Sequence, residues 1–356
     1  MSRIRCFELQ RAASKALPGH RVGQCLRRPL PERSVGIRQR EDRSTYYQGL
    51  RTCGSVWACP VCASKVSERR RSELRGAVDI HQAFGGSVVL ATFTLPHQAP
   101  DRAFGLVDDL LDCYRRLWSG RDRVTPHLAG YVGSVRALEV THGEHGWHPH
   151  LHVLFFFEDE VNLGEVLFHL YTRWARLIEA AGRGTISPRH GVTVQGGEAA
   201  ADYVAKWGHE PRWTIAEELT KANVKQARSS AGRSPFALLA DFAGGDQGAG
   251  TLFREFVDAF KGRSQLRWSR SLRKRLGLSV EKSDEELAAT VDALDELLGS
   301  FHENDWKLIA RHELRGAVLE VARLDGWAGV LALLELFKRV DTTDGFCRAE
   351  LEGSSG

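Results

Sequence analysis

The chain has 356 residues, of which 42% are hydrophobic and 26% are charged, and its formal net charge is +4 at neutral pH. This composition is typical of globular proteins and excludes a wholly disordered chain, a collagen and a coiled-coil rod, and the length allows about two domains. No apolar run approaches the ~18 residues that a membrane span needs, and no apolar signal segment follows the basic N-terminus. We therefore expect a cytoplasmic protein with no membrane partner.

The charge is unevenly distributed along the chain. Residues 1–80 contain 17 basic and 7 acidic residues, and arginine outnumbers lysine 39 to 10 in the whole sequence. This pattern favours a nucleic-acid partner, and a solvated arginine-rich tail is the alternative. The seven cysteines are odd in number and no signal peptide is visible, which favours reduced thiols and a metal site over disulfides.

Residues 1–50 show no sustained hydrophobic period, and we expect a loop or a partly ordered arm there. The elements that follow are mixed, and a hairpin with a turn around Gly143 to Gly146 lies at their centre. This mixture predicts an α+β fold with a central antiparallel sheet flanked by helices. The expected elements are a helix over residues 65–83, a strand over 87–95, a helix over 101–118, hairpin strands over 131–142 and 147–157, a helix over 163–182, a strand over 190–195 and a short helix over 198–207.

The later part of the chain changes composition twice. Residues 226–250 are rich in Ser, Gly and Ala, and residues 261–275 contain seven basic residues and no acidic residue. Residues 281–350 contain 8 basic and 16 acidic residues and have a helical period with a break at Asp325-Gly326. We expect four parts: a basic N-terminal arm with a Cys-rich knuckle (1–83), a central domain (84–225), a Gly/Ser-rich seam with a basic DNA-contact segment (226–278) and an acidic helical tail (279–356).

Three histidines alternate in the run His148-Pro149-His150-Leu151-His152. Because side chains alternate along a strand, His150 and His152 point to the same face. The hairpin turn brings Glu139 beside His150 on the neighbouring strand. Two imidazoles and a carboxylate suit Mg²⁺ or Mn²⁺. We favour this metal site over satisfied core histidines, because imidazoles buried among Val, Leu and Phe need partners.

Tyr203 and Lys206 lie three residues apart on the short helix after Gly196-Gly197. A free phenol has a pKa of about 10, so it needs help to act as a nucleophile. A nearby ammonium would favour the phenolate, and a metal ion could polarise the electrophile. The alternative is a packing tyrosine beside a surface lysine.

Cys59 and Cys62 form a C-x₂-C pair, and Cys53 lies six residues upstream. Cys25 completes a set of four thiolates that would hold a structural zinc ion, with His20 as a substitute ligand. The alternative is a group of thiols without a metal ion.

Two basic runs are expected to contact DNA phosphates, and a tryptophan in the second could stack on a base. In both runs a solvated helix face is the alternative. The residues are Arg69, Arg70 and Arg71 after the knuckle, and Arg263, Arg267, Trp268, Arg270, Arg273, Lys274 and Arg275 in the later segment.

Four stretches of the sequence together resemble the rolling-circle replication initiators of bacterial plasmids, single-tyrosine members of the HUH single-strand endonuclease superfamily. The resemblance covers roughly residues 50–278, and the stretches occur in the family's order. The tyrosine follows the histidines, whereas relaxases of the superfamily have it before them. The stretches are CGSVWACPVCASKVSERRR, ATFTLPH, RALEVTHGEHGWHPHLHVLFF and AADYVAKWG.

The resemblance implies a metal-dependent, site-specific single-strand DNA endonuclease and strand transferase, with residues 84–225 as its nicking domain. His150 and His152 match the family's metal-binding pair. Tyr203 matches the nucleophile that forms a 5′-phosphotyrosyl link and frees a 3′-hydroxyl to prime synthesis, and Lys206 matches the motif's basic residue. The partners implied are single-stranded or hairpin origin DNA and the host DNA polymerase, helicase and single-strand-binding protein.

One position departs from the family pattern. Initiators of this type can carry a glutamate one turn before the tyrosine, as the base for a terminating hydrolysis, and that position is Ala199 here. Glu198 and Asp202 are nearby candidates without that spacing, so the terminating base stays open. Two other functions stay open as well: a zinc-stabilised DNA-binding regulator with an inactive nuclease core, and a related transposase.

Overall fold

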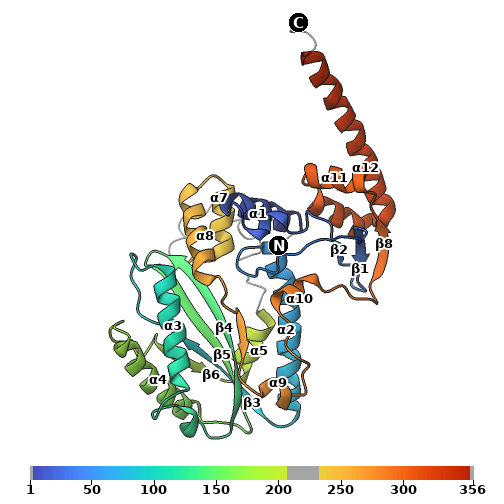
Figure 1. Ribbon diagram of the computed structural model, residues 1–356. Coiled ribbons are helices and arrows are strands. Elements are labelled where there is room, and N and C mark those ends of the chain that lie inside the picture. The colour runs from blue at the N-terminus through green and yellow to red at the C-terminus, as the bar shows by residue number, and fades with distance from the viewer. Residues whose placement is uncertain (1–2, 207–231, 353–356) are drawn as a thin grey trace. The chain divides into compact units, whose positions relative to one another are not determined.

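The computed structural model describes residues 3–206 and 232–352, and the side chains of Lys206 and of residues 340–352 lie outside that description (Figure 1). The chain divides into two compact units, and the first and last parts of the sequence belong to the same one. The four-part division expected from the sequence stays a prediction, and its boundary at residue 225 lies outside the described residues. Unit 1 consists of Met1–Ser55, Cys59–Cys62 and Asp284–Gly356, and unit 2 of Val56–Ala58 and Ala63–Ser283.

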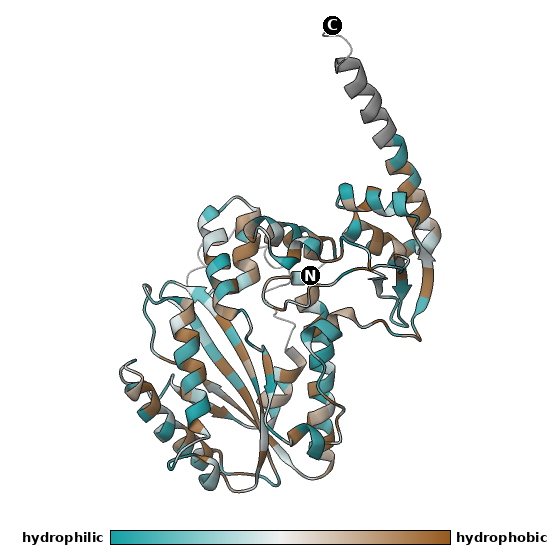
Figure 2. Cartoon of the chain, in the orientation of Figure 1, coloured by the Kyte–Doolittle hydropathy of each residue, from teal (hydrophilic) through white to brown (hydrophobic). Residues whose placement is uncertain are grey.

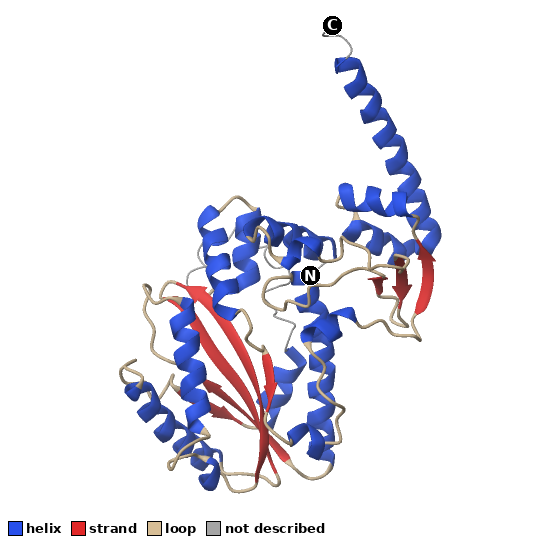
Figure 3. Cartoon of the chain, viewed as in Figure 1, coloured by secondary structure: helices blue, strands red, loops and turns tan. Residues whose placement is uncertain are grey.

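Unit 2 is built on a five-stranded antiparallel sheet in the order β6-β3-β5-β4-β7 (Figure 3). The central hairpin follows the predicted register, with Glu139 opposite His150. Its turn uses Gly146, whose φ of 83° lies in the left-handed region that favours glycine. The strands are β3 (Ser87–Phe93), β4 (Tyr131–Gly143), β5 (Gly146–Phe157), β6 (Val192–Gln195) and β7 (Leu266–Trp268).

Helices cover both faces of this sheet (Figure 1). On one face, Phe93 of β3 contacts Tyr114 and Trp174, with ring centroids 5.8 and 5.1 Å apart. On the other face, Leu154 and other strand residues pack in one cluster with residues of α2 and α5. Hydrophobic residues run along these strands with hydrophilic interruptions (Figure 2). The helices are α2 (Pro60–Ala83), α3 (Ala103–Leu117), α4 (Leu163–Ala180), α5 (Gly197–Lys206), α7 (Pro235–Ala243), α8 (Gln247–Phe260) and α9 (Leu272–Arg275).

Unit 1 contains a three-stranded antiparallel sheet in the order β2-β1-β8. Phe7, Ile37 and Tyr47 from the start of the chain share one hydrophobic core with Trp306 and Val318 from its end. The expectation of a loop or arm over residues 1–50 is therefore wrong, because these residues are ordered by distant partners that no local period reveals. The elements are α1 (Arg3–Ala16), the 3₁₀ helix η1 (Arg21–Gln24), β1 (Gly36–Gln39), β2 (Thr45–Gln48), α10 (Asp284–Ala289), β8 (Glu296–Ser300), α11 (Glu303–Arg311) and α12 (Arg315–Glu352).

The α+β class, the antiparallel sheets flanked by helices and the helical C-terminal region agree with the sequence-based prediction. The break predicted at Asp325-Gly326 is a kink in α12, where Gly326 has a φ of 66° and a ψ of −158°. Among the described residues, no helix combines the length and the apolar character that crossing a membrane requires.

Two candidate metal centres

Three side chains that can bind a metal ion meet on the hairpin of β4 and β5. His152 lies two residues beyond His150 on the same face of β5. Nε2 of His150 and Nε2 of His152 lie 3.6 and 3.7 Å from the same atom, Oε2 of Glu139. The three ligand atoms lie within 4.8 Å of one another. Strand alternation thus brings together the nitrogen and oxygen donors that suit a divalent ion.

The second ring nitrogen of each histidine is held by a neighbouring group. Nδ1 of His150 lies 3.2 Å from the carbonyl oxygen of His148, and a carbonyl only accepts, so this nitrogen carries the proton. Nδ1 of His152 lies 3.0 Å from Oγ1 of Thr92, which is opposite His152 in the β3–β5 register. Such outer contacts fix the ring orientation and tautomer of metal-binding histidines.

Burial and neighbouring charges favour protonation states that bind metal ions. Burial acts to raise the pKa of Glu139, but the hydrogen bond with His150 and the charges of both histidines outweigh it and lower that pKa to about 2. Burial lowers the pKa of His152 to about 4, against the opposing charge of Glu139. Burial likewise lowers the pKa of His148 to about 4, with a contribution from His150. The carboxylate and neutral imidazoles are the forms that act as ligands.

Helix α5 brings Tyr203 to the same cluster. Its neighbours Ala200 and Val204 are buried in the hydrophobic cluster between α5 and the sheet. The hydroxyl of Tyr203 donates a hydrogen bond to Oε1 of Glu139 at 2.9 Å. The rings of Tyr203 and His152 have centroids 4.8 Å apart. Glu139 therefore has one carboxylate oxygen toward the tyrosine and the other toward the two histidines.

The other candidates on α5 have different positions. Ala199 lies one turn before Tyr203 and packs against the same hydrophobic cluster. Glu198 and Asp202 are exposed. Neither is three or four residues from Tyr203, so neither shares its helical face. Lys206 is the last residue of α5, and its side chain lies outside the described residues.

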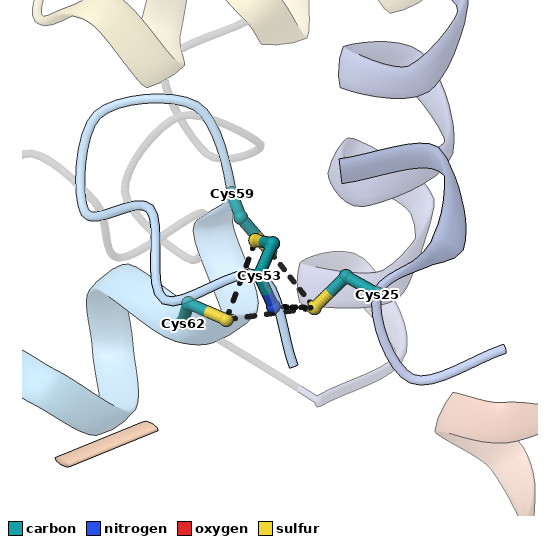
Figure 4. A group of neighbouring side chains, drawn as sticks. All are labelled: Cys25, Cys53, Cys59 and Cys62. Carbon is teal, nitrogen blue, oxygen red and sulfur yellow. Dashed lines mark hydrogen bonds between the residues drawn. The ribbon is translucent and has the colours of Figure 1, made fainter. Parts of the chain in front are cut away.

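Four sulfur atoms converge in unit 1 (Figure 4). Cys25 is the C-cap of η1, and Cys62 lies in the first turn of α2. Sγ of Cys62 lies 3.5 Å from that of Cys25 and 3.6 Å from that of Cys53. Sγ of Cys59 lies 3.7 Å from that of Cys25. Zn–S bonds of ~2.3 Å in a tetrahedron separate the sulfurs by ~3.8 Å, so this spacing fits a zinc ion and is too long for a disulfide.

Hydrogen-bond donors surround the sulfurs. The side-chain amide of Gln10 donates to Sγ of Cys59 at 3.3 Å, and the backbone N–H of Cys53 donates to Sγ of Cys25 at 3.4 Å. Nη1 of Arg315, whose side chain is fully buried, donates to Oε1 of Gln10 at 2.9 Å. Such donors favour the thiolate form that binds zinc.

His20, the substitute ligand expected from the sequence, has another contact. It is the N-cap of η1, and its Nδ1 accepts a hydrogen bond from the backbone N–H of Val22 at 3.1 Å. The group of ligand atoms that the described residues form here consists of the four cysteines.

Many of the basic residues expected to contact DNA are held by carboxylates of unit 2. Arg70 pairs with Glu281 at 3.1 Å, and its side chain is 7% exposed. Arg273 donates to both carboxylate oxygens of Glu73, at 2.6 and 2.8 Å. Trp268 is buried, which argues against base stacking. The further ion pairs join Arg71 to Glu68, Arg263 to Asp108 and Arg275 to Glu158.

Four basic residues of these two runs remain to be described. Arg267, Arg270 and Lys274 are exposed, and Arg69 is half-buried. Arg267 lies on β7 opposite Arg136 of β4. The candidates for DNA contact that are exposed and outside these ion pairs are therefore fewer than the sequence suggests: Arg267, Arg270 and Lys274.

Sequence reasoning missed Thr92, Gln10 and Arg315. Thr92 has a signal in the sequence, because it lies in the strand stretch ATFTLPH and alternation gives it a definite face. Gln10 and Arg315 have no such signal, since their contacts span 49 and 305 positions of the chain.

Comparisons with known proteins identify one family and two relatives. The model of a family described as "Replication protein" matches residues 47–312. "Protein rep" of Streptomyces lividans is 31% identical in an alignment that covers 74% of this chain and 72% of that protein. "Neomycin resistance protein" of Streptomyces cyanogenus is 36% identical over 30% of this chain and 30% of its own length. No solved structure matches the chain. The family match includes the histidine, glutamate and tyrosine cluster.

Proposed function

The chain belongs to the replication protein (Rep) family of plasmid replication initiators, and we propose that it nicks and rejoins single-stranded origin DNA to start rolling-circle replication. One observation carries this proposal: Oε1 of Glu139 accepts the hydrogen bond of the Tyr203 hydroxyl, while Oε2 lies near two histidine nitrogens. A nucleophile and a set of metal ligands thus share one carboxylate. This arrangement supports an HUH-type endonuclease.

In the proposed reaction, Oη of Tyr203 attacks the phosphorus atom of the scissile phosphodiester. The bond from phosphorus to the 3′-oxygen breaks, a 5′-phosphotyrosyl link forms, and the 3′-oxygen takes a proton from water to become a free 3′-hydroxyl. Oε1 of Glu139 lies 2.9 Å from the tyrosine hydroxyl and accepts its hydrogen bond, which orients Oη, and the proton of the hydroxyl passes to water. The link keeps the energy of the broken bond for later rejoining.

Nε2 of His150, Nε2 of His152 and Oε2 of Glu139 would hold the divalent ion, Mg²⁺ or Mn²⁺. When bound, this ion supplies Lewis acidity toward a non-bridging phosphate oxygen. Thr92 and the carbonyl oxygen of His148 keep the two imidazoles oriented for this purpose. We also propose a structural zinc ion held by the four cysteines, since the sulfur spacing and the surrounding N–H donors fit it.

The host DNA polymerase, helicase and single-strand-binding protein would act on the 3′-hydroxyl and the displaced strand. Lys206 would assist Tyr203 as the basic residue of the motif. Glu198 and Asp202 are the two candidates for the base that serves termination. Replacing each with alanine and measuring termination would show which of them acts.

The test uses a labelled single-stranded origin oligonucleotide from the same replicon, with Mn²⁺, with Mg²⁺ and with a chelator. We expect a metal-dependent covalent protein–DNA adduct that disappears in Tyr203→Phe. Tyr171→Phe is the matched control, because the hydroxyl of Tyr171 donates to the carbonyl oxygen of Ile186 on α4's side of the sheet. Tight binding without an adduct under any metal would overturn the proposal and favour a DNA-binding regulator.

A further inference from the structure

Two segments of unit 1, residues 26–30 and 49–53, run side by side. The backbone N–H of Leu26 donates to the carbonyl oxygen of Arg51 at 2.7 Å. The backbone N–H of Arg51 donates to the carbonyl oxygen of Arg28 at 2.9 Å. A further backbone bond of 2.8 Å joins the far ends of the two segments. These bonds fix the separation of the two backbones.

The cysteine cluster holds both segments at one end. Cys25 directly precedes the first segment, and Cys53 is the last residue of the second. Their sulfurs belong to the four-sulfur group, and Cys53 also donates its N–H to Sγ of Cys25. Nη1 of Arg315 donates to the carbonyl oxygens of Cys25 and Leu26, each at 3.2 Å. The arginine side chains of the two segments have no part in these contacts.

Four arginines lie on these segments and the adjoining turn: Arg27, Arg28, Arg33 and Arg51. Arg27 has a carboxylate partner. Among the described side chains, those of residues 3–205 and 232–339, none forms a hydrogen bond or an ion pair with the guanidinium groups of Arg28, Arg33 and Arg51. Arg28, Arg33 and Arg51 are all exposed. Glu32 is the single acidic residue in the sequence of the two segments and this turn. Positive charge therefore outweighs negative charge here.

The neighbouring arginines differ in this respect. Arg21 pairs with Glu285 at 2.8 Å, and Arg27 pairs with Glu313 at 2.5 Å. These carboxylates are thus already neutralised by other arginines. A guanidinium without a protein partner keeps its fork of N–H donors for an outside oxyanion, and phosphate fits that fork.

We propose that Arg28, Arg33 and Arg51 form a phosphate-binding surface that contacts the backbone of the origin duplex, an inference that rests on the proposed function. The duplex is favoured because neither segment contains an aromatic residue, and aromatic stacking is the usual means of gripping single strands. The cysteine cluster keeps the two segments at the separation that their backbone bonds define. Loss of its metal ion weakens the surface without removing a positive charge.

The test measures how the affinity of the full chain for a labelled origin duplex changes with salt concentration. Each lost phosphate contact reduces the slope of log affinity against log salt by about 0.9. We expect Arg28→Gln/Arg51→Gln to reduce this slope by about 2 relative to the wild-type chain, with weaker binding throughout. Arg33→Glu, on the exposed turn, gives a second variant and is expected to weaken binding as well.

The matched control is Arg11→Gln/Arg43→Gln, which removes the same charge from exposed arginines elsewhere in unit 1. An equal slope change in the control and the test variant would overturn the surface, as would an unchanged slope in the test variant. Adduct formation on a short single-stranded oligonucleotide is measured in parallel. Normal adducts with a reduced slope support both proposals, whereas absent wild-type adducts contradict the proposed function and leave the slope result to decide the surface.

Discussion

The hydroxyl of Tyr203 donates a hydrogen bond to Oε1 of Glu139 at 2.9 Å, across 64 positions of the sequence. The other oxygen of this carboxylate lies 3.6 Å from Nε2 of His150. Any change in the orientation of Glu139 therefore affects its contacts with the tyrosine and with the two histidines together. The residues that hold this cluster in place can be tested separately from the cluster itself.

Thr92→Val is expected to weaken binding of Mn²⁺ by about 10- to 100-fold, because His152 loses the partner of its Nδ1. Valine keeps the shape of threonine, so the sheet is expected to fold normally. The measurement is calorimetric titration of the full chain with Mn²⁺. Thr251→Val is the control, since Thr251 is exposed on α8 and its hydroxyl donates to the backbone carbonyl of Gln247. Unchanged affinity in Thr92→Val would contradict the role of this contact.

Cys62→Ser is expected to abolish binding of one zinc ion per chain, because a hydroxyl replaces a thiolate in a four-thiolate site. The measurement is the number of zinc ions per chain in the purified protein, determined by elemental mass spectrometry. Cys113→Ser is the matched control: Cys113 is buried in unit 2, and its Sγ contacts the carbonyl oxygen of Leu177. Equal zinc contents in the two variants would count against the site.

Arg315→Met is expected to lower the free energy of unfolding of unit 1 by about 3–5 kcal/mol, because it leaves a carboxylate and buried acceptors without their charged partner. The Arg315 side chain is fully buried and donates to Glu313 at 2.8 Å as well as to Gln10. Denaturant unfolding followed by circular dichroism measures the change. Arg323→Met removes an exposed arginine of α12 and is expected to leave stability unchanged. A loss of similar size in both variants would show that burial is not the cause.

Acid is expected to destabilise unit 1 in part through Glu313. Burial acts to raise its pKa, but hydrogen bonds from Arg27 and Arg315 outweigh burial and hold the pKa below its ordinary value. Such a carboxyl stabilises the fold above its unfolded pKa of about 4.3, and this contribution is lost as the pH falls through the folded pKa. Glu313→Gln should therefore show a shallower loss of stability below about pH 5 than the wild-type chain. Parallel stability curves against pH would refute this.

The central hairpin and its cluster were predictable because their contacts follow from local rules. Strand alternation gives His150 and His152 one face, and a short glycine turn fixes Glu139 opposite His150. The sulfur cluster was predictable from cysteine spacing. These features depend on residue types and periods that a single sequence displays.

Contacts between distant segments were not predictable in this way. Tyr47 packs with Trp306, and Arg273 pairs with Glu73, although no local period links these positions. The arginine runs look alike in the sequence, but distant carboxylates bind Arg70 and Arg273 and leave Lys274 exposed. The sequence shows which side chains are charged. Only the fold shows whether a charged side chain pairs with another residue of the chain or stays exposed to bind another molecule.

Unit 1 joins the two ends of the chain, and this has a consequence during translation. The ribosome releases residues 63–283, the bulk of unit 2, before it has made residues 284–356. Synthesis proceeds at about 5–20 residues per second and domains fold as they emerge, so unit 2 can form while unit 1 still lacks most of its core. The four cysteines are all made by residue 62, and Arg315 reaches them only near the end of synthesis. A premature stop after residue 283 would therefore yield a nascent protein with its five-stranded sheet complete but without the hydrogen bond from Arg315 to Cys25.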